Sequence, residues 1–331
     1  MNVSTEGVSM GKPRAELQYL SIAGQILEEG EPTDDRTGVG TLDLFGEPQM
    51  AYDLREEFPL LTSKNVATKA VRSELSWMLH GDTNLRYLAE HDNHIWDEWP
   101  FVAYLKKTNQ TIPEQGNEEW KTAKDAYLQK IKNDADFAKE YGNLGPIYGH
   151  QWRAWADYDG NPIDQLRIAQ EQIRSGKASR RIIVSAWNVS DLDEMSKAGL
   201  PPCHTLFQFN ASNQADPKTG KKYLDMKMYQ RSADWFLGVP FNMVQYAMLL
   251  SAMAQTTGRV PRHFYHTFGS AHIYKNHIEQ IKEQLSRQDN LYDAPRLQLN
   301  PEITDIGDFN AEDFKIVGYK HHPSIKGQVA I

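Results

Sequence analysis

Apolar residues recur at helical spacing in several parts of the chain. Such a pattern predicts a helix when the apolar residues share one face and a glycine follows as a stop signal. Four segments fit this description: the residues from Tyr19 to Leu27 before Gly30, residues 66–80 before Gly81, residues 243–254 before Gly258, and the residues marked by Ile278, Ile281 and Leu285. Residues 243–254 are apolar on nearly every face, so we expect this helix at the centre of the fold.

Period-two patterns predict strands in the second half of the chain. Leu224, Met226 and Met228 alternate with polar residues, which indicates a sheet with one buried face. Residues 182–187 and 205–211 are further strand candidates, and the polar stretch 212–222 is typical of a hairpin loop. Helices and strands are mixed without strict alternation, so we expect an α+β fold rather than a doubly wound sheet.

Residues 101–143 differ in composition from the rest of the chain. They are denser in charge and lack strong apolar runs, although Trp120, Tyr127 and Ile131 mark one amphipathic helix. We therefore expect a single domain over residues 1–331, with an insert of surface helices at about 101–143.

Charge and cysteine content exclude several classes of protein. Lys and Arg number 36 and Asp and Glu number 44, which gives a net charge of -8. An acidic chain is a poor general binder of nucleic acid or anionic membranes, so a bound anion must meet a local basic cluster. The lone Cys203 excludes an intramolecular disulfide and a thiolate zinc cluster, and it fits a reducing compartment.

Membrane, secretion and metal signals are also missing from the sequence. Residues 1–11 contain no apolar run typical of a signal peptide, and residues 243–254 are too short for a membrane span. The histidines form no metal-ligand motif such as His-Glu-x-x-His. We expect a cytoplasmic protein with no metal and no membrane partner.

Cys203 is the first candidate for chemistry. Pro201 and Pro202 fix the backbone in front of the thiol, immediately before a predicted strand. A lone cysteine is more often an inert buried residue than a nucleophile. Rigid presentation, with arginines elsewhere in the chain to lower its pKa, favours the nucleophile.

Arginines recur in polar turns. Arg36 lies in the glycine-rich segment 34–40, Arg180 and Arg181 precede a predicted strand, and Arg231 is next to Ser232. Adjacent arginines are often plain surface charge, whereas a guanidinium beside a hydroxyl is suited to holding a phosphate. The glycines of 34–40 permit close approach of the backbone to a ligand, but a plain hairpin turn explains them equally well.

Three further features have two interpretations each. Glu74 lies beside the apolar face of the helix 66–80, either at a solvated edge or as a partly desolvated carboxylate with a raised pKa. Asn242 is either the N-cap of the helix that follows or an amide that reads the edge of a base. Trp96 and Trp99 are either core residues or a stacking wall.

Together these segments resemble the thymidylate synthase family, from about Leu17 to Ile331, with the charged insert interrupting the match. The most specific stretches are Leu-Pro-Pro-Cys-His at 200–204 and Gln-Arg-Ser-Ala-Asp-Trp-Phe-Leu-Gly-Val-Pro-Phe-Asn at 230–242. Further matching stretches are 35–40, 58–62, 95–99, 144–148 and 179–188.

The resemblance implies a large mixed β-sheet flanked by helices, and a homodimer packed sheet to sheet. It implies reductive methylation of dUMP to dTMP, with methylenetetrahydrofolate as the co-substrate that gives a one-carbon unit and a hydride. Cys203 would add as a thiolate to the pyrimidine ring. The other catalytic residues implied are Glu74, Tyr148, His204, Asp234 and Arg231.

The resemblance also implies the binding residues. Those for dUMP are Arg36, Arg180, Arg181, Gln230, Arg231, Ser232, Asn242, His272 and Tyr274, with Arg180 and Arg181 donated across the dimer interface. Of these, His272 and Tyr274 would bind the deoxyribose hydroxyl. Those for the reduced folate are Lys64, Ile95, Trp96, Trp99, Asp234, Leu237, Gly238, Phe241 and Ile331.

Two positions depart from the family's pattern. Ser270 replaces the usual aspartate two residues before His272, which puts a supporting hydrogen bond to this histidine in doubt, and Asn210 replaces an aromatic residue.

A pyrimidine nucleotide hydroxymethylase on the same scaffold is the alternative activity. Related dCMP enzymes carry aspartate at the position of Asn242, so asparagine favours uracil. Binding of nucleic acid as the main role is disfavoured by the net charge.

Overall fold

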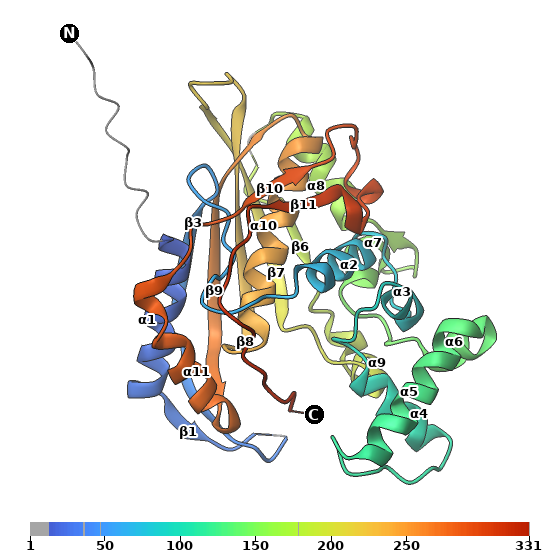
Figure 1. The fold of residues 1–331 in the computed structure, drawn as a ribbon. Helices are drawn as coiled ribbons and strands as arrows, with labels where there is room; N and C mark the ends of the chain where they lie inside the picture. The colour runs from blue at the N-terminus through green and yellow to red at the C-terminus, as the bar shows by residue number, and fades with distance from the viewer. Residues whose placement is uncertain (1–12, 36, 47, 178, 331) are drawn as a thin grey trace.

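The computed structural model describes residues 13–330 with the exception of residues 36, 47 and 178 (Figure 1). Its helices are α1 (Arg14–Glu29), α2 (Thr68–Leu79), α3 (Leu85–Glu90), α4 (Glu98–Lys107), α5 (Glu118–Asn133), α6 (Ala135–Tyr141), α7 (Gly149–Ala154), α8 (Gln165–Arg174), α9 (Leu192–Ala198), α10 (Gly238–Thr256) and α11 (Ile278–Leu285). Its strands are β1 (Glu31–Thr33), β2 (Thr41–Phe45), β3 (Gln49–Asp53), β4 (Trp155–Ala156), β5 (Pro162–Ile163), β6 (Ile183–Ser185), β7 (His204–Ala215), β8 (Lys222–Asp234), β9 (Val260–Tyr274), β10 (Arg296–Leu299) and β11 (Phe314–Val317).

The main sheet has seven strands among the described residues, in the order β1-β2-β9-β8-β7-β6, and β3 also pairs with β9. Neighbouring strands are antiparallel except β8 and β9, which run parallel. Two-stranded sheets, β4-β5 and β10-β11, lie outside it. The predicted α+β fold with a large mixed sheet is therefore confirmed.

Helices α1 and α10 pack on the same face of this sheet, and the apolar residues Ile183, Leu206 and Tyr229 on the opposite face are exposed. Helix α10 packs against β8 and β9 on one face and against α2 on its other side, while α1 packs against β2, β3 and β9. Because α10 is enclosed on all sides, its sequence needs no polar face. It begins at Gly238, so Asn242 lies within the helix, and the N-cap interpretation of Asn242 is wrong.

The predicted elements are confirmed with shifted ends. The predicted helix 66–80 is α2, the predicted strand 182–187 shortens to β6, and strands β7 and β8 both extend beyond their predicted ends on either side of the predicted hairpin. Strand β9 was not predicted as a whole. Pro261, Gly269 and several histidines interrupt its alternation, although it is the strand that pairs with β2, β3 and β8.

The charged region contains α5, α6 and most of α4, joined by an aromatic cluster. Ring centroids of Phe101 and Trp120 are 5.1 Å apart, and those of Tyr104 and Tyr127 are also 5.1 Å apart. The amphipathic helix predicted from Trp120, Tyr127 and Ile131 is α5, with these three residues buried. The cluster is contiguous with the main core of the molecule.

Candidate active site

Cys203 immediately precedes β7, where Arg231 of the neighbouring strand β8 fixes the backbone around it. The guanidinium of Arg231 donates hydrogen bonds from Nε to the Pro202 carbonyl at 3.0 Å and from Nη2 to the Pro201 carbonyl at 2.8 Å. The backbone N–H of Arg231 donates to the Cys203 carbonyl at 2.8 Å. These bonds to the two prolines that precede the thiol hold the Arg231 cation close to the candidate nucleophile.

The Cys203 thiol is half-buried, and its electrostatic environment has opposing components. Burial raises the pKa of the thiol, while the charge of Arg231 and hydrogen bonds to the Tyr148 and Ser232 side chains act in the opposite direction. The net effect is a raised pKa. Arg231 therefore acts on the thiol in the expected direction, toward a lower pKa, although burial is the larger effect.

Tyr148 contacts Cys203 from the start of α7. Its Oη accepts a hydrogen bond from the Cys203 backbone N–H at 2.8 Å, and burial raises the pKa of the phenol. Tyr148 has φ 22° and ψ −83°, an unfavourable conformation for a residue with a side chain. A Cβ on the next residue, Gly149, would lie 3.0 Å from the backbone oxygens of Met78 and Asp82, so a larger residue would push α7 away from α2.

Glu74 is buried on α2 with 7% of its surface exposed. Its Oε1 accepts a hydrogen bond from Trp96 Nε1 at 2.7 Å, and its Oε2 accepts one from Gln245 Nε2 at 2.8 Å. Burial raises the pKa of this carboxyl to about 7, although both hydrogen bonds favour the charged form. The interpretation as a desolvated carboxylate is confirmed, and the solvated-edge interpretation is wrong.

A directed chain of hydrogen bonds links β9, β8, α10 and β7. His266 Nε2 donates to Gln230 Oε1 at 2.8 Å, Gln230 Nε2 donates to Asn242 Oδ1 at 2.9 Å, and Asn242 Nδ2 donates to His204 Nε2 at 2.9 Å. Burial lowers the pKa of His204 to about 3, so its ring is neutral and carries its proton on Nδ1, 3.2 Å from Tyr246 Oη. The chain fixes which way the Asn242 amide points.

The end of β8 presents polar side chains with a period of two. Gln230, Ser232 and Asp234 share one face of the strand, and Asp234 lies opposite His272 of β9. Asp234 Oδ1 accepts hydrogen bonds from the backbone N–H groups of Phe236 and Leu237, both at 3.0 Å. The Tyr274 ring lies 5.3 Å from the His272 ring, on the same side of β9.

The hydrogen bond that we doubted at Ser270 is present. Ser270 Oγ lies 3.1 Å from His272 Nδ1 and donates to Asp43 Oδ2 at 2.6 Å. Asn210 is the other position that departs from the family's pattern. Its Nδ2 donates to Asp225 Oδ2 at 3.0 Å, so a polar contact replaces the packing of an aromatic ring.

Aromatic and apolar residues predicted for the folate lie next to Glu74 and at the start of α10. The Trp96 ring is 5.6 Å from Trp99 and 6.0 Å from Tyr148. Ile95, Leu237 and Phe241 are half-buried at the edge of the core, and Gly238 is the first residue of α10.

Lys64 is 5% exposed, and its Nζ donates to the Phe236 carbonyl. Burial lowers the pKa of its ammonium to about 7. Contact with an anionic folate tail therefore requires Lys64 to leave this position.

Four predicted residues are not placed in this group. Arg180 and Arg181 are exposed before the edge strand β6, and Arg36 and Ile331 lie outside the described residues. No group of three or more His, Cys, Asp or Glu residues in the described chain is arranged to hold a metal ion. Among the described helices, none is both long and apolar enough to cross a membrane.

Sequence reasoning missed several residues that hold the site together. Gln245 and Tyr246 are hidden in the apolar run of α10, and His266 lies in the strand that was not predicted. Asp43 had a visible signal, since it stands between Leu42 and Leu44 in a strand and so points to the opposite face.

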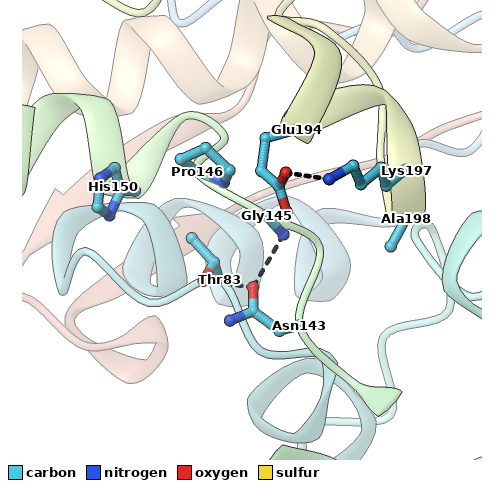
Figure 2. Close-up of a pocket in the computed structure, with 8 residues that line it drawn as sticks. All are labelled: Thr83, Asn143, Gly145, Pro146, His150, Glu194, Lys197 and Ala198. Atoms are coloured by element: carbon cyan, nitrogen blue, oxygen red, sulfur yellow. Dashed lines mark hydrogen bonds and ion pairs between the residues drawn. The ribbon is translucent and has the colours of Figure 1, made fainter. Parts of the chain in front are cut away.

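A separate surface pocket has a volume of about 400 Å³. Figure 2 shows the residues that line it. The eight residues that line it include no predicted site residue, and an ion pair between Glu194 and Lys197 forms one side. Asn143 Oδ1 accepts hydrogen bonds there from Thr83 Oγ1 at 3.1 Å and from the Gly145 N–H at 2.8 Å. These contacts support the loop that leads to Tyr148.

The group around Cys203 combines a rigidly presented thiol with a cation, a carboxyl with a pKa near neutrality and a neutral imidazole. This combination suits covalent addition of the thiol to a substrate with proton transfer nearby. In comparison with known proteins, a family model described as thymidylate synthase matches residues 17–331 of the chain.

Proposed function

The chain belongs to the thymidylate synthase family, and from this premise we propose that it converts dUMP to dTMP with methylenetetrahydrofolate as co-substrate. The family also includes related hydroxymethylases, so membership alone leaves the reaction open. The single observation that carries the proposal is the orientation of Asn242 beside the Cys203 group.

The Asn242 amide supports uracil as the base. Its oxygen accepts from Gln230 and its nitrogen donates to His204, so the amide cannot turn over without losing both hydrogen bonds. Uracil presents a donor at N3 and an acceptor at O4, whereas cytosine presents the opposite pattern. A fixed amide therefore discriminates between the two bases.

Each residue of the candidate site has its own role in the proposed reaction. Cys203 would add to the pyrimidine ring, and Arg231 would stabilise the thiolate as well as the nucleotide phosphate. Glu74 would hold or release a proton near the ring, since its pKa is about 7. Ser232 would donate to the phosphate, and His272 and Tyr274 would contact the sugar hydroxyl.

The folate co-substrate supplies a one-carbon unit and a hydride when bound. The tryptophan pair beside Glu74 and the apolar side chains at the start of α10, where Asp234 accepts from the Leu237 N–H, offer rings and methyl groups to a flat heterocycle. A hydroxymethylase would use water in place of the hydride, so analysis of the product separates the two reactions.

A homodimer is part of the proposal. The strand register places Ile183, Leu206 and Tyr229 on one face of the sheet, where they are 46%, 38% and 37% exposed. Exposed apolar side chains clustered on a sheet mark a protein interface. Packing two such faces together would bury them and could bring Arg180 and Arg181 to the site of the other subunit.

Mass spectrometry of the protein mixed with 5-fluoro-dUMP and methylenetetrahydrofolate tests the proposal. Fluorine at C5 blocks the proton removal that resolves the intermediate, so we expect a stable covalent complex of protein, nucleotide and folate attached at Cys203. Cys203→Ser should form none. A wild-type protein that forms no adduct, or that yields a hydroxymethyl product from dUMP, would contradict the proposal.

A further inference from the structure

Three polar side chains from two strands meet at the sugar end of the proposed nucleotide site. Strands β2 and β9 are antiparallel, with Asp43 opposite His272 and Phe45 opposite Ser270. Asp43, Ser270 and His272 therefore share one face of the sheet. Ser270 Oγ lies between the other two, 2.6 Å from Asp43 Oδ2 and 3.1 Å from His272 Nδ1.

The number of available protons fixes the direction of these hydrogen bonds. An ionised carboxylate can only accept, so the single hydroxyl proton of Ser270 goes to Asp43. The Ser270 oxygen is then an acceptor toward His272, and Nδ1 of His272 must carry a proton. In the neutral ring this leaves Nε2 with a lone pair.

We propose that Asp43 and Ser270 are positioning residues that hold the His272 imidazole in the Nδ1–H tautomer, so that Nε2 accepts the hydrogen of the deoxyribose hydroxyl of dUMP. The inference rests on the proposed function, which supplies the nucleotide. It assigns a role to Asp43, which no motif had indicated.

This arrangement also accounts for the departure at Ser270. Where the family pattern has an aspartate before the histidine, this chain has a hydroxyl, and the carboxylate stands on the neighbouring strand. One carboxylate and one hydroxyl remain available to orient the ring. The two groups should therefore be exchangeable between positions 43 and 270.

The binding constant for dUMP tests this role. We call the hydrogen-bonded series Asp43–Ser270–His272 the relay. Ser270→Ala and Asp43→Ala each remove one hydrogen bond of this relay. We expect each variant to raise the dUMP Kd, measured by calorimetry, about 10-fold. We expect kcat at saturating dUMP to change less than about 3-fold, because Cys203 and Glu74 keep their hydrogen bonds. The double alanine variant should bind no more weakly than either single variant, since both break the same relay.

The exchange variant is the rescue test. A protein that combines Asp43→Ser with Ser270→Asp retains a carboxylate and a hydroxyl, and its dUMP Kd should return to within about 3-fold of wild type. Thr219→Ala is the matched control, because Thr219 Oγ1 also donates to an aspartate, at 2.7 Å, but in the β7–β8 turn. It should leave the dUMP Kd unchanged.

Nitrogen-15 NMR of the imidazoles gives a readout that needs no substrate. His272 in the wild-type protein should show a protonated Nδ1, and Ser270→Ala should shift the ring toward the other tautomer. If an alanine variant fails to fold, Asp43→Asn and the exchange variant carry the test, since both keep a hydrogen-bond partner for each group.

The outcomes separate this inference from the proposed function. A wild-type protein that forms the fluoronucleotide adduct, together with alanine variants whose dUMP Kd and tautomer equal those of wild type, overturns the relay alone. An exchange variant that folds but binds dUMP as weakly as the single variants overturns it too. A wild-type protein that forms no adduct but shows the Nδ1–H tautomer, lost in Ser270→Ala, overturns the proposed function and leaves the relay geometry in place.

Discussion

Glu74 shows how a buried side chain acquires a proton affinity suited to catalysis. Two donors, Trp96 and Gln245, stabilise its charged form, yet desolvation is the larger effect and raises the pKa from 4.5 to about 7. The carboxyl is therefore about half protonated at neutral pH, where it can both give and take a proton. This fine balance is invisible in the sequence, which shows only an acidic residue beside an apolar helix face.

The raised pKa of Glu74 should make the free energy of unfolding depend on pH. The protonated form is favoured in the folded state, so ionisation costs stability as pH rises above the unfolded value of 4.5, and the cost levels off above about 7. Glu74→Gln lacks this cost. Its free energy of unfolding relative to wild type should therefore improve by up to about 3 kcal/mol between pH 4.5 and pH 7.

Urea unfolding at four pH values from 4.5 to 8 measures this difference. Glu302→Gln, at an exposed position, serves as the control and should show no such trend. The same Glu74→Gln protein should lose about 100-fold or more in kcat, because the proton carrier that we propose is gone. A stability difference between Glu74→Gln and wild type that is independent of pH would show that the carboxyl titrates normally.

At the scale of elements, the hydrophobic pattern predicted the helices and strands whose buried residues are mostly apolar. It missed the strand whose buried face carries polar residues. Helix α10 was predictable because every face is apolar, as were β8 and the hairpin before it. Strand β9 was not, since buried His266 and His272 and the half-buried Ser270 replace the apolar residues that mark a strand. Those polar residues belong to the candidate site, so the part of the sheet with the proposed function carries the weakest pattern.

The C-terminal segment is fixed by contacts from distant elements. The Gln328 carbonyl lies 2.9 Å from His277 Nε2, and the Val329 carbonyl accepts a hydrogen bond from Gln115 Nε2 at 3.2 Å. Gln115 belongs to the loop between α4 and α5, in the charged region. Figure 1 shows the segment ending between the sheet and these helices.

Gln115→Ala should therefore loosen this segment. Loss of one hydrogen bond is expected to speed amide hydrogen exchange in residues 327–330 about 5-fold, as measured by mass spectrometry. Gln110→Ala is a matched control, because Gln110 lies in the same loop and donates to Thr108 and Tyr104 instead. Equal exchange in the two variants would show that the charged region does not hold the C-terminal segment.

At the scale of the whole molecule, the position of the arginines argues for a shared site. Arg231 contacts the backbone in front of Cys203 within one chain, while Arg180 and Arg181 are exposed at the far edge of the same sheet. A phosphate bound near Arg231 needs further cations. Association through the exposed sheet face would supply them from a second copy.

Mixing two inactive variants tests this arrangement. Arg181→Glu chains keep Cys203, and Cys203→Ala chains keep Arg181, so a heterodimer has one intact site if the arginine acts across the interface. With equal amounts and free subunit exchange, half of the dimers are mixed, and activity should recover to about a quarter of wild type. Arg231→Ala mixed with Cys203→Ala is the control and should recover nothing, because Arg231 and Cys203 act within one chain. If the first mixture also stays inactive after exchange is verified by mass spectrometry, Arg181 serves its own chain or none, and the shared site is refuted.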